Sequence, residues 1–323
     1  MNIFQEHQAP DLEEVLKRLQ EFKTRLNSSF VAREQEIDMM IVAAIAQEPI
    51  LFIGTPGTGK SALIGQFKKL LDISEEDYFE YMLTKFTEPS EIIGPLDLKR
   101  LKVGEFHRRV EGKLPTAKLV FLDEVFKSNS AILNTLLTII NERKFYQDGK
   151  PHPVPLKVLF GATNEIPTHT ELDALKDRFT LKLKVSKVTE DKWDDLLFKG
   201  LENDTRKYFN QQQFSDTVFS LDDFEFLHQH IQKSLMTVGE TGEDLYFGKN
   251  LYMEFKRILK TIIHDFEIEI SDRKIIKLYR LIRCHALFKR GGGVEKEDFI
   301  LLKHLGNQLD EIEFLKEKIQ NIL

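Results

Sequence analysis

A glycine-rich segment directly after a short apolar run places the tightest limit on how this chain can fold. Residues 49–54 read PILFIG, and residues 54–61 read GTPGTGKS. The second run fits the pattern G-x-x-x-x-G-K-[ST], whose glycines let successive backbone N–H groups turn toward one phosphate. Residues 60–71 follow with apolar side chains at helical spacing. The sequence therefore predicts a strand, a phosphate-binding loop and a helix, in that order.

Alternating strand and helix patterns extend this unit through the first 187 residues. The predicted strands are near-continuous apolar runs, which is the pattern of a sheet buried on both faces. Strands that alternate with helices favour a parallel sheet flanked by helices. The further predicted strands are residues 78–84, 118–123, 156–162 and 180–185, and the further predicted helices are residues 11–27, 34–47, 130–144 and 171–177.

The strand pattern fades after residue 185, and the remaining sequence has mostly helical spacing. We therefore expect an α/β fold, with a parallel-sheet core followed by an all-α domain. The expected parts are an N-terminal helix within residues 1–25, an α/β nucleotide-binding core at residues 26–187 and a helical lid domain at residues 188–323.

The charge balance and the cysteine count argue against several classes of protein. Lys and Arg number 46 against 52 Asp and Glu, a net charge of −6, whereas a protein that coats nucleic acid or anionic lipid needs a basic face. The single cysteine, Cys284, excludes an intrachain disulfide and a multi-cysteine zinc site, and it suits a reducing compartment. No apolar run approaches the ~20 residues of a membrane span, and residues 1–10 lack the pattern of a secretory signal. We expect a cytoplasmic protein.

Two adjacent acids, Asp123 and Glu124, end the apolar run KLVFLDE. On a strand beside the phosphate-binding loop, Asp123 and the Ser61 hydroxyl are expected to bind Mg²⁺, while Lys60 contacts phosphate oxygens. Glu124 is then placed to polarise a water molecule, which favours hydrolysis over transfer of the phosphoryl group to a small molecule. The alternative is a solvated strand end, although neighbouring carboxylates raise each other's pKa.

Asn164 follows another predicted strand, within the run LKVLFGATN. Ligands of parallel sheets bind beyond the carboxyl ends of the strands, so Asn164 is expected to orient the attacking water or contact the γ-phosphate. Asparagine also favours turns for local backbone reasons, and on this residue alone that alternative stays open.

Two arginines outside the loop are further candidates. Arg178, in LKDRF, is either a surface partner of Asp177 or an arginine finger that enters a neighbouring subunit's site. Arg273 follows Ser271, a good N-cap, and so falls in the first turn of a predicted helix, where a cation opposes the helix dipole. A nearby nucleotide phosphate would make that placement favourable.

Residues 99–113 (KRLKVGEFHRRVEGK) form the one markedly basic stretch. We expect a turn at residues 103–106 between two short strands, which makes a hairpin that either contacts a client or nucleic acid or is simply solvated. A second hairpin is expected at residues 145–154, with Asp148-Gly149 as its turn.

Taken together, these motifs resemble the AAA+ ATPases, and more narrowly the MoxR group and its RavA-like branch. The similarity extends from about residue 26 to about residue 305. The stretches that carry it are GTPGTGKS, MLTKFTEPSEIIGPL, VFLDEVFKSNSAILNTLLTIINERKF, GATNEIP, ALKDRF and ISDRK.

The resemblance implies an ATP-hydrolysing ring, usually a hexamer, whose active sites lie between subunits and use ATP, ADP and Mg²⁺. It makes Lys60 and Ser61 Walker A residues, Asp123 and Glu124 Walker B, Asn164 sensor 1, Arg178 the arginine finger and Arg273 sensor 2. Residues 96–114 match a helix-2 insert and residues 145–154 a pre-sensor-1 hairpin, both facing the pore. The expected partners are further copies of this chain, a protein client and a protein with a von Willebrand factor A domain.

The catalytic residues expected on these grounds are Lys60, Glu124, Asn164 and Arg178. The resemblance also places Phe30 and Val31 near the adenine. The full set expected to contact the nucleotide is Phe30, Val31, Gly54, Thr55, Pro56, Gly57, Thr58, Gly59, Lys60, Ser61, Ala62 and Arg273.

The sequence alone leaves three possible functions open. The first is an ATPase motor that remodels or activates protein partners. The second is a nucleic-acid motor or loader, which the acidic balance disfavours. The third is a non-catalytic nucleotide switch or scaffold, which has no need of a water-orienting carboxylate at Glu124.

Overall fold

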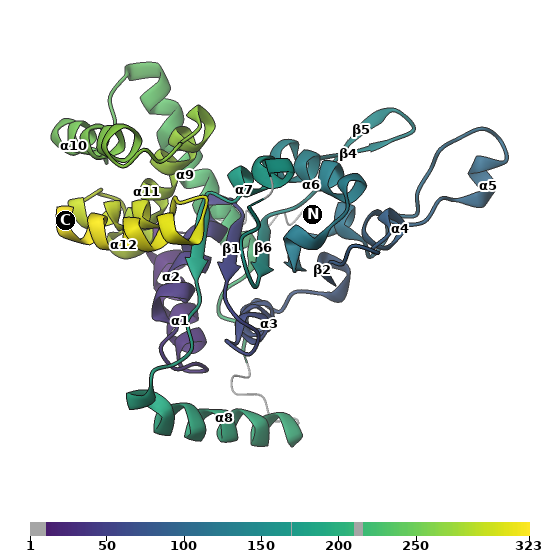
Figure 1. The fold of residues 1–323 in the computed structure, drawn as a ribbon, viewed down its shortest axis with the longest axis horizontal. Coiled ribbons are helices and arrows are strands. Elements are labelled where there is room, and N and C mark those ends of the chain that lie inside the picture. The colour runs from purple at the N-terminus through teal and green to yellow at the C-terminus, as the bar shows by residue number, and fades with distance from the viewer. Residues whose placement is uncertain (1–10, 169, 210–215) are drawn as a thin grey trace, which may run out of the picture.

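Five parallel strands form the central sheet, in the order β2-β3-β6-β1-β7 (Figure 1). The structure is a computed structural model that describes residues 11–168, 170–209 and 216–323. Residues 1–10, within the segment where an N-terminal helix was expected, lie outside the described residues. The strands are β1 (Ile50–Ile53), β2 (Tyr78–Met82), β3 (Leu119–Asp123), β6 (Val158–Thr163) and β7 (Leu181–Lys184).

Helices cover both faces of this sheet, which explains why its strands are continuously apolar. Along β1, Ile50 and Phe52 join one buried cluster, while Leu51 and Ile53 join a second cluster on the other face. The first face carries α1 (Leu12–Asn27), α2 (Glu34–Ala46) and α3 (Lys60–Leu70), and the second carries α4 (Pro89–Ile93), α6 (Ser130–Glu142) and α7 (Asp173–Arg178).

The chain after β7 is helical, as the spacing predicts. Most of this part packs beside α1 and α2, whereas α8 lies apart at one end of the molecule (Figure 1). The helices are α8 (Trp193–Tyr208), α9 (Leu221–Thr241), α10 (Lys249–Lys260), α11 (Asp272–Arg290) and α12 (Leu309–Ile322), with a 3₁₀ segment at Lys296–His304 before α12.

A cluster of phenylalanines joins this helical part to the sheet. Phe224 of α9 stacks on Phe67 of α3 with ring centroids 5.9 Å apart, and Phe67 meets Phe160 of β6 edge-on at 5.1 Å. Phe22 of α1 contacts both Phe67 and Phe224. Core and helical part therefore share one apolar interior.

Ion pairs reinforce the same junction. The Arg18 guanidinium of α1 donates two hydrogen bonds to Asp223 of α9, at 2.6 and 3.0 Å. Glu48, which is buried before β1, pairs with Lys277 of α11 at 2.6 Å. Because buried charges are costly unless paired, these contacts fix how α9 and α11 sit against the core.

The basic stretch departs from the sequence prediction. Residues 98–101 form the one-turn helix α5 (Leu98–Leu101) rather than a strand, because the Asp97 carboxylate accepts hydrogen bonds from the backbone N–H groups of Lys99 and Arg100 and caps that turn. Only one antiparallel bridge, Leu96 with Arg108, holds the base of the segment. The expectation of two short strands around residues 103–106 is thus wrong.

The second hairpin is confirmed. β4 (Lys144–Gln147) pairs with β5 (Lys150–Pro153), and Asp148 and Gly149 both have positive φ, of 50° and 70°. Two positive-φ residues are what a two-residue hairpin turn of this hand requires. Within the described residues, no helix combines the length and apolar character needed to cross a bilayer.

We expect Phe224→Ala to lower the free energy of unfolding by about 3–5 kcal/mol, because the truncation leaves a cavity between α3 and α9. Urea denaturation followed by far-UV circular dichroism measures this change. Phe86→Ala is the control, since Phe86 is 91% exposed, and it should shift stability by no more than about 0.5 kcal/mol. A separate early transition for the helical part alone would contradict the shared interior.

Candidate functional site

The loop between β1 and α3 has the backbone that a phosphate cradle needs. Gly57 and Gly59 have φ of 83° and 85°, a region that favours glycine. A Cβ on Gly54 would lie 2.4 Å from the Val185 carbonyl oxygen, so no other residue fits there without a shift. The Thr58 hydroxyl donates to the Thr55 carbonyl at 3.0 Å and closes the turn.

Lys60 lies folded into this loop. Its ammonium donates to the Gly54 carbonyl at 2.5 Å and the Thr55 carbonyl at 3.3 Å. Burial lowers the pKa of Lys60, while the negative charges of Asp123 and Glu124 act in the opposite direction. The Lys60 ammonium thus donates its hydrogen bonds to backbone carbonyls of the loop. Such hydrogen bonds are weaker than those that the ammonium would make to a phosphate group.

The ends of β3 and β6 bring Glu124 and Asn164 together. β3 pairs with β6 and β6 pairs with β1, so the residues that follow these strands share the edge that carries the loop. The Asn164 amide donates to the Glu124 carboxylate, and the Lys127 ammonium lies 3.3 Å from the same oxygen. These two contacts hold the Glu124 carboxylate in one orientation.

The backbone at Glu124 is unusual. Glu124 has φ 52° and ψ 43°, a left-handed conformation that costs about 1 kcal/mol or more for a residue with a Cβ. The turn is stabilised by the Glu124 N–H, which donates to the Asp123 carboxylate at 2.8 Å. It directs the Glu124 side chain toward Asn164, and such local strain is typical of functional positions.

Phe30 and Val31 line a cavity of about 440 Å³ near the loop. Arg33 connects this segment to the loop, because its guanidinium donates to the Thr58 carbonyl at 3.1 Å and the Ser186 carbonyl at 3.0 Å. The opposite wall is α8, through Asp195, Phe198, Lys199 and Glu202, together with Lys192 directly before the helix. Sequence reasoning missed both Arg33 and α8. The amphipathic spacing of residues 193–201 was the available signal for α8.

The structure does not bring Arg178 or Arg273 to the loop of their own chain. Arg178 precedes β7, whose first residue pairs with Ile50 at the start of β1, whereas the loop follows the end of β1. Arg178 therefore lies at the amino-terminal edge of the sheet. Arg273 lies there too, since its guanidinium donates to Asn141 at 3.5 Å. Burial lowers the pKa of Arg178, and the nearby charge of Arg273 is the next cause.

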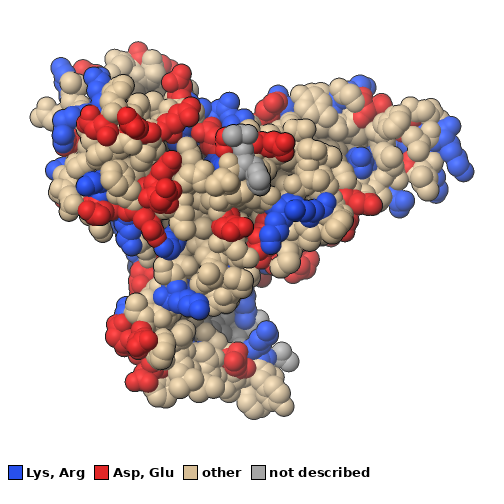
Figure 2. Space-filling model, viewed as in Figure 1, with Lys and Arg blue, Asp and Glu red and all other residues tan. Residues whose placement is uncertain are grey.

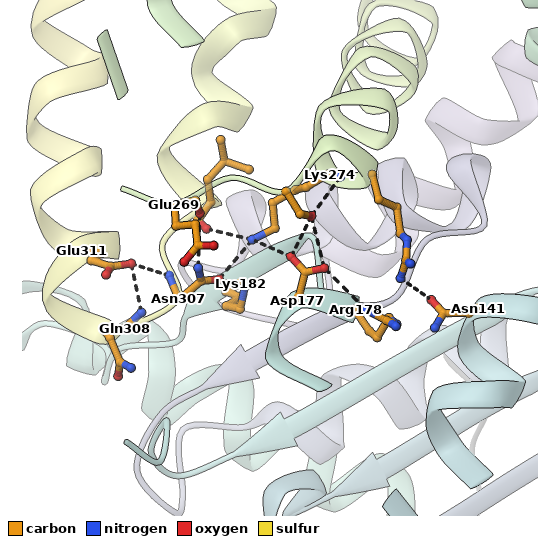
Figure 3. Close-up of polar contacts among 12 residues, drawn as sticks. Asn141, Asp177, Arg178, Lys182, Glu269, Lys274, Asn307, Gln308 and Glu311 are labelled. Atoms are coloured by element: carbon orange, nitrogen blue, oxygen red, sulfur yellow. Dashed lines mark hydrogen bonds and ion pairs between the residues drawn. The ribbon is translucent and has the colours of Figure 1, made fainter. Parts of the chain in front are cut away.

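Asp177 holds this second edge together (Figure 3). Its carboxylate accepts from the Ser271 hydroxyl at 3.1 Å and pairs with Arg178 at 3.5 Å and Lys274 at 3.7 Å. Ser271 also caps α11, where its hydroxyl accepts from the Lys274 N–H. One carboxylate thus links the end of α7, with Arg178, to the start of α11, with Arg273.

Two buried lysines lie beneath this network. The ammonium groups of Lys182 and Lys274 are 3.3 and 3.0 Å from the Asn307 side-chain oxygen (Figure 3). Burial lowers the pKa of both lysines, and for Lys182 it does so strongly, with the charge of Lys274 as the next cause. Burying these two amino groups so close together therefore costs stability.

The two projecting segments contact each other. Gln147 of β4 contacts the His107 ring, and the Phe106 N–H donates to the Asp148 carboxylate at 3.4 Å. Figure 1 shows α5 and the β4–β5 hairpin extending from the same side of the core, and Figure 2 shows Lys and Arg side chains at the far tip. Val103 and Phe106 of the first segment and Tyr146 of the hairpin are exposed.

Family comparisons match most of the chain. A model described as the MoxR domain in the MoxR-vWA-β-propeller ternary systems matches residues 17–223. A model of an AAA lid domain matches residues 250–319.

Individual relatives are similar to this chain over much of its length. An uncharacterized protein of Methanocaldococcus jannaschii is 33% identical over 314 residues, which is 96% of this chain and 76% of that protein. The chaperone MoxR1 of Mycobacterium tuberculosis is 21% identical over 173 residues, 52% of this chain and 44% of that protein. The crystal structure of a candidate ATPase from Cytophaga hutchinsonii has the same fold, with a TM-score of 0.71 and 16% identity over 97% of this chain and 96% of that chain.

We expect stability to rise with pH from neutral toward about pH 10, because unfolded Lys182 keeps its proton up to its ordinary pKa while the folded residue binds protons less tightly. Lys182→Met should therefore stabilise the protein at pH 7, by about 1–4 kcal/mol, and flatten this rise. Urea titrations at several pH values measure both effects. Lys99→Met, at an exposed lysine, is the control, and parallel pH curves for Lys182→Met and wild type would contradict the assignment.

Proposed function

The chain belongs to the MoxR family of AAA+ ATPases, and from that premise we propose that it hydrolyses ATP in a head-to-tail ring and uses the energy to remodel or activate protein partners. One observation carries the proposal: the predicted site residues are divided between the two edges of the sheet. The loop, Glu124 and Asn164 lie at one edge of the sheet, and Arg178 and Arg273 lie together at the other.

The residues of the first edge fit a nucleoside triphosphate. Lys60 is buried against carbonyl groups of its own loop, and a phosphate is a stronger partner for that ammonium. Gly57 and Gly59 let the loop N–H groups face a phosphate, and the start of α3 adds the positive end of its dipole. We propose that Gly54–Ala62 bind the triphosphate and that Phe30 and Val31 contact the base.

Glu124 is the proposed water-activating group. Its carboxylate is oriented by the Asn164 amide and lies beside the Lys127 ammonium, so it is placed to accept a proton from a water molecule aligned with the γ-phosphate. Ser61 and Asp123 would hold Mg²⁺, which supplies positive charge to the phosphate oxygens. Asn164 acts as the positioning group that keeps the Glu124 carboxylate aimed.

The arginines are proposed to act on a neighbouring protomer. Parallel strands separate them from their own loop, whereas a head-to-tail neighbour presents its loop to this second edge. Arg178 and Arg273 would then stabilise the negative charge that develops on the transferred phosphoryl group. Repeated head-to-tail contacts close into a ring when the rotation from one protomer to the next divides a full turn. We propose that the ring is a hexamer.

Partners and location are proposed on separate grounds. The exposed apolar and basic side chains of the two projecting segments support contact with a protein client. The matched family is named for systems with a vWA component, and MoxR1 is named as a chaperone, so we propose a vWA-domain partner and a chaperone-like role. Motif similarity supports the RavA-like branch. The single buried thiol, Cys284, supports a cytoplasmic location.

Glu124→Gln is expected to abolish steady-state ATP hydrolysis, by about 100-fold or more, because the amide accepts no proton from water. Nucleotide affinity should stay within a few-fold of wild type, since Lys60 and the loop are unchanged. Phosphate release and fluorescent-nucleotide titration measure the two quantities. Glu76→Gln, at an exposed glutamate, should behave as wild type, and full turnover by Glu124→Gln would refute the assigned role.

Mixing two inactive variants tests the shared site. Arg178→Ala is expected to reduce hydrolysis about 10³-fold or more, and Lys60→Ala to prevent phosphate binding. In a mixture, some protomers with an intact loop face an intact arginine, so part of the activity returns, in proportion to mixed interfaces. Phosphate release over a range of mixing ratios measures this. Activity no higher than the sum of the two variants would rule out an arginine that acts between protomers.

A further inference from the structure

An open apolar groove of about 900 Å³ lies among α9, α10 and α11, away from the loop. Met236 and Ile276 are two-thirds exposed although both line it. Three cations, Lys256, Lys260 and Arg280, line the same groove. Its other apolar walls are Leu235, Tyr252, Phe255, Leu259, Ile263, Ile275 and Tyr279. Such a surface is typical of a docking site for an apolar helix face.

α8 carries an exposed apolar face of matching character. Trp193, Leu197 and Leu201 are each more than half exposed, and at 100° per residue they lie within about 80° of one another. Asp195 and Glu202 face the cavity beside residues 30–34, on the other side of the helix. The apolar face therefore points away from its own core.

The proposed ring brings these two surfaces together. Arg273, Ile276 and Arg280 share one face of α11 and together line a smaller cavity, so the groove adjoins Arg273. α8 adjoins the loop, because Asn203 donates to the Ser29 carbonyl at 3.0 Å and Arg33 links that segment to Thr58. Figure 1 shows α8 at the opposite end of the molecule from α9 and α10.

We propose that the outward face of α8 docks into the α9–α10–α11 groove of the next protomer in the ring. This inference rests on the proposed function, in which Arg273 of one protomer approaches the loop of its neighbour. The groove beside Arg273 then meets the helix beside that loop. The occupant of the groove is thus a second copy of this chain.

Charge complementarity supports this occupant. Asp194 and Asp204 lie on the apolar side of α8, within about 100° of Trp193 along the helix. The groove offers Lys256 and Lys260 as exposed partners. The apolar side of α8 thus carries two acids and one lysine, Lys207, and it faces a groove that is lined by three cations. Such charge complementarity selects one partner over others.

Disulfide crosslinking tests the contact directly. Cys284 is fully buried and its pKa is raised to about 12, so the wild-type thiol stays unreactive. Leu197→Cys protein mixed with Ile276→Cys protein, in ATP with copper phenanthroline as oxidant, should give a covalent dimer that neither gives alone. The double variant Leu197→Cys/Ile276→Cys should give a ladder of linked chains on a non-reducing gel. Leu197→Cys with Val103→Cys is the control pair and should not crosslink.

A charge exchange provides a second readout that does not depend on cysteine geometry. Asp194→Lys/Asp204→Lys should weaken ATP-promoted assembly at least tenfold in midpoint concentration. Adding Lys256→Glu/Lys260→Glu in the same chain should restore most of that loss. All four positions are exposed, so each variant should keep the wild-type unfolding midpoint.

The outcomes separate this inference from the proposed function. Crosslinking in the mixture, with rescue by the exchanged charges, supports the docking. Assembly by light scattering and recovered activity in the Arg178→Ala plus Lys60→Ala mixture, without crosslinking or rescue, would overturn the docking and leave the shared site standing. No assembly and no recovered activity would overturn both.

Discussion

The parallel register of β1 with its two neighbours is the constraint on which the rest of this structure depends. Because every strand of the sheet points the same way, everything that follows a strand gathers at one edge and everything that precedes a strand gathers at the other. Lys60, Glu124 and Asn164 come together at the first edge without being near in sequence. Arg178 is excluded from that edge by the same rule, so a site that needs both sets needs two chains.

The helical part strengthens this division. Phe22, Phe67 and Phe224 pack α9 against α1 and α3. The ion pair of Glu48 with Lys277 links α11 to the segment before β1. Asp177 then joins the start of α11 to the end of α7. One carboxylate therefore holds the segments that carry Arg178 and Arg273 next to each other. The burial of Lys182 and Lys274 makes that junction costly in stability.

Contiguous motifs made much of the fold and the first edge predictable. The apolar runs predicted the strands because both faces of the sheet are buried. The runs GTPGTGKS and FLDE each hold their functional residues within a few positions, so the chemistry of the first edge was recognisable from the sequence. Features set by distant packing were not predictable. Asp97 caps a helical turn where strands were expected, Lys182 looks solvent-facing in TLKLKV but is buried, and the distance of Arg273 from its own loop depends on how α11 packs. The roles of individual site residues stay predictions.

α8 lies at one end of the molecule and the groove lies at the other. This arrangement has a consequence for how copies of the chain assemble. If copies associate as proposed, an open chain of copies leaves one apolar helix face and one apolar groove exposed to water, whereas closure into a ring buries both at once. The final subunit to join therefore gains twice the contact of any earlier one. Partial assemblies should therefore be scarce. Protomers without nucleotide, which keep both apolar surfaces exposed, should be the form most prone to aggregation.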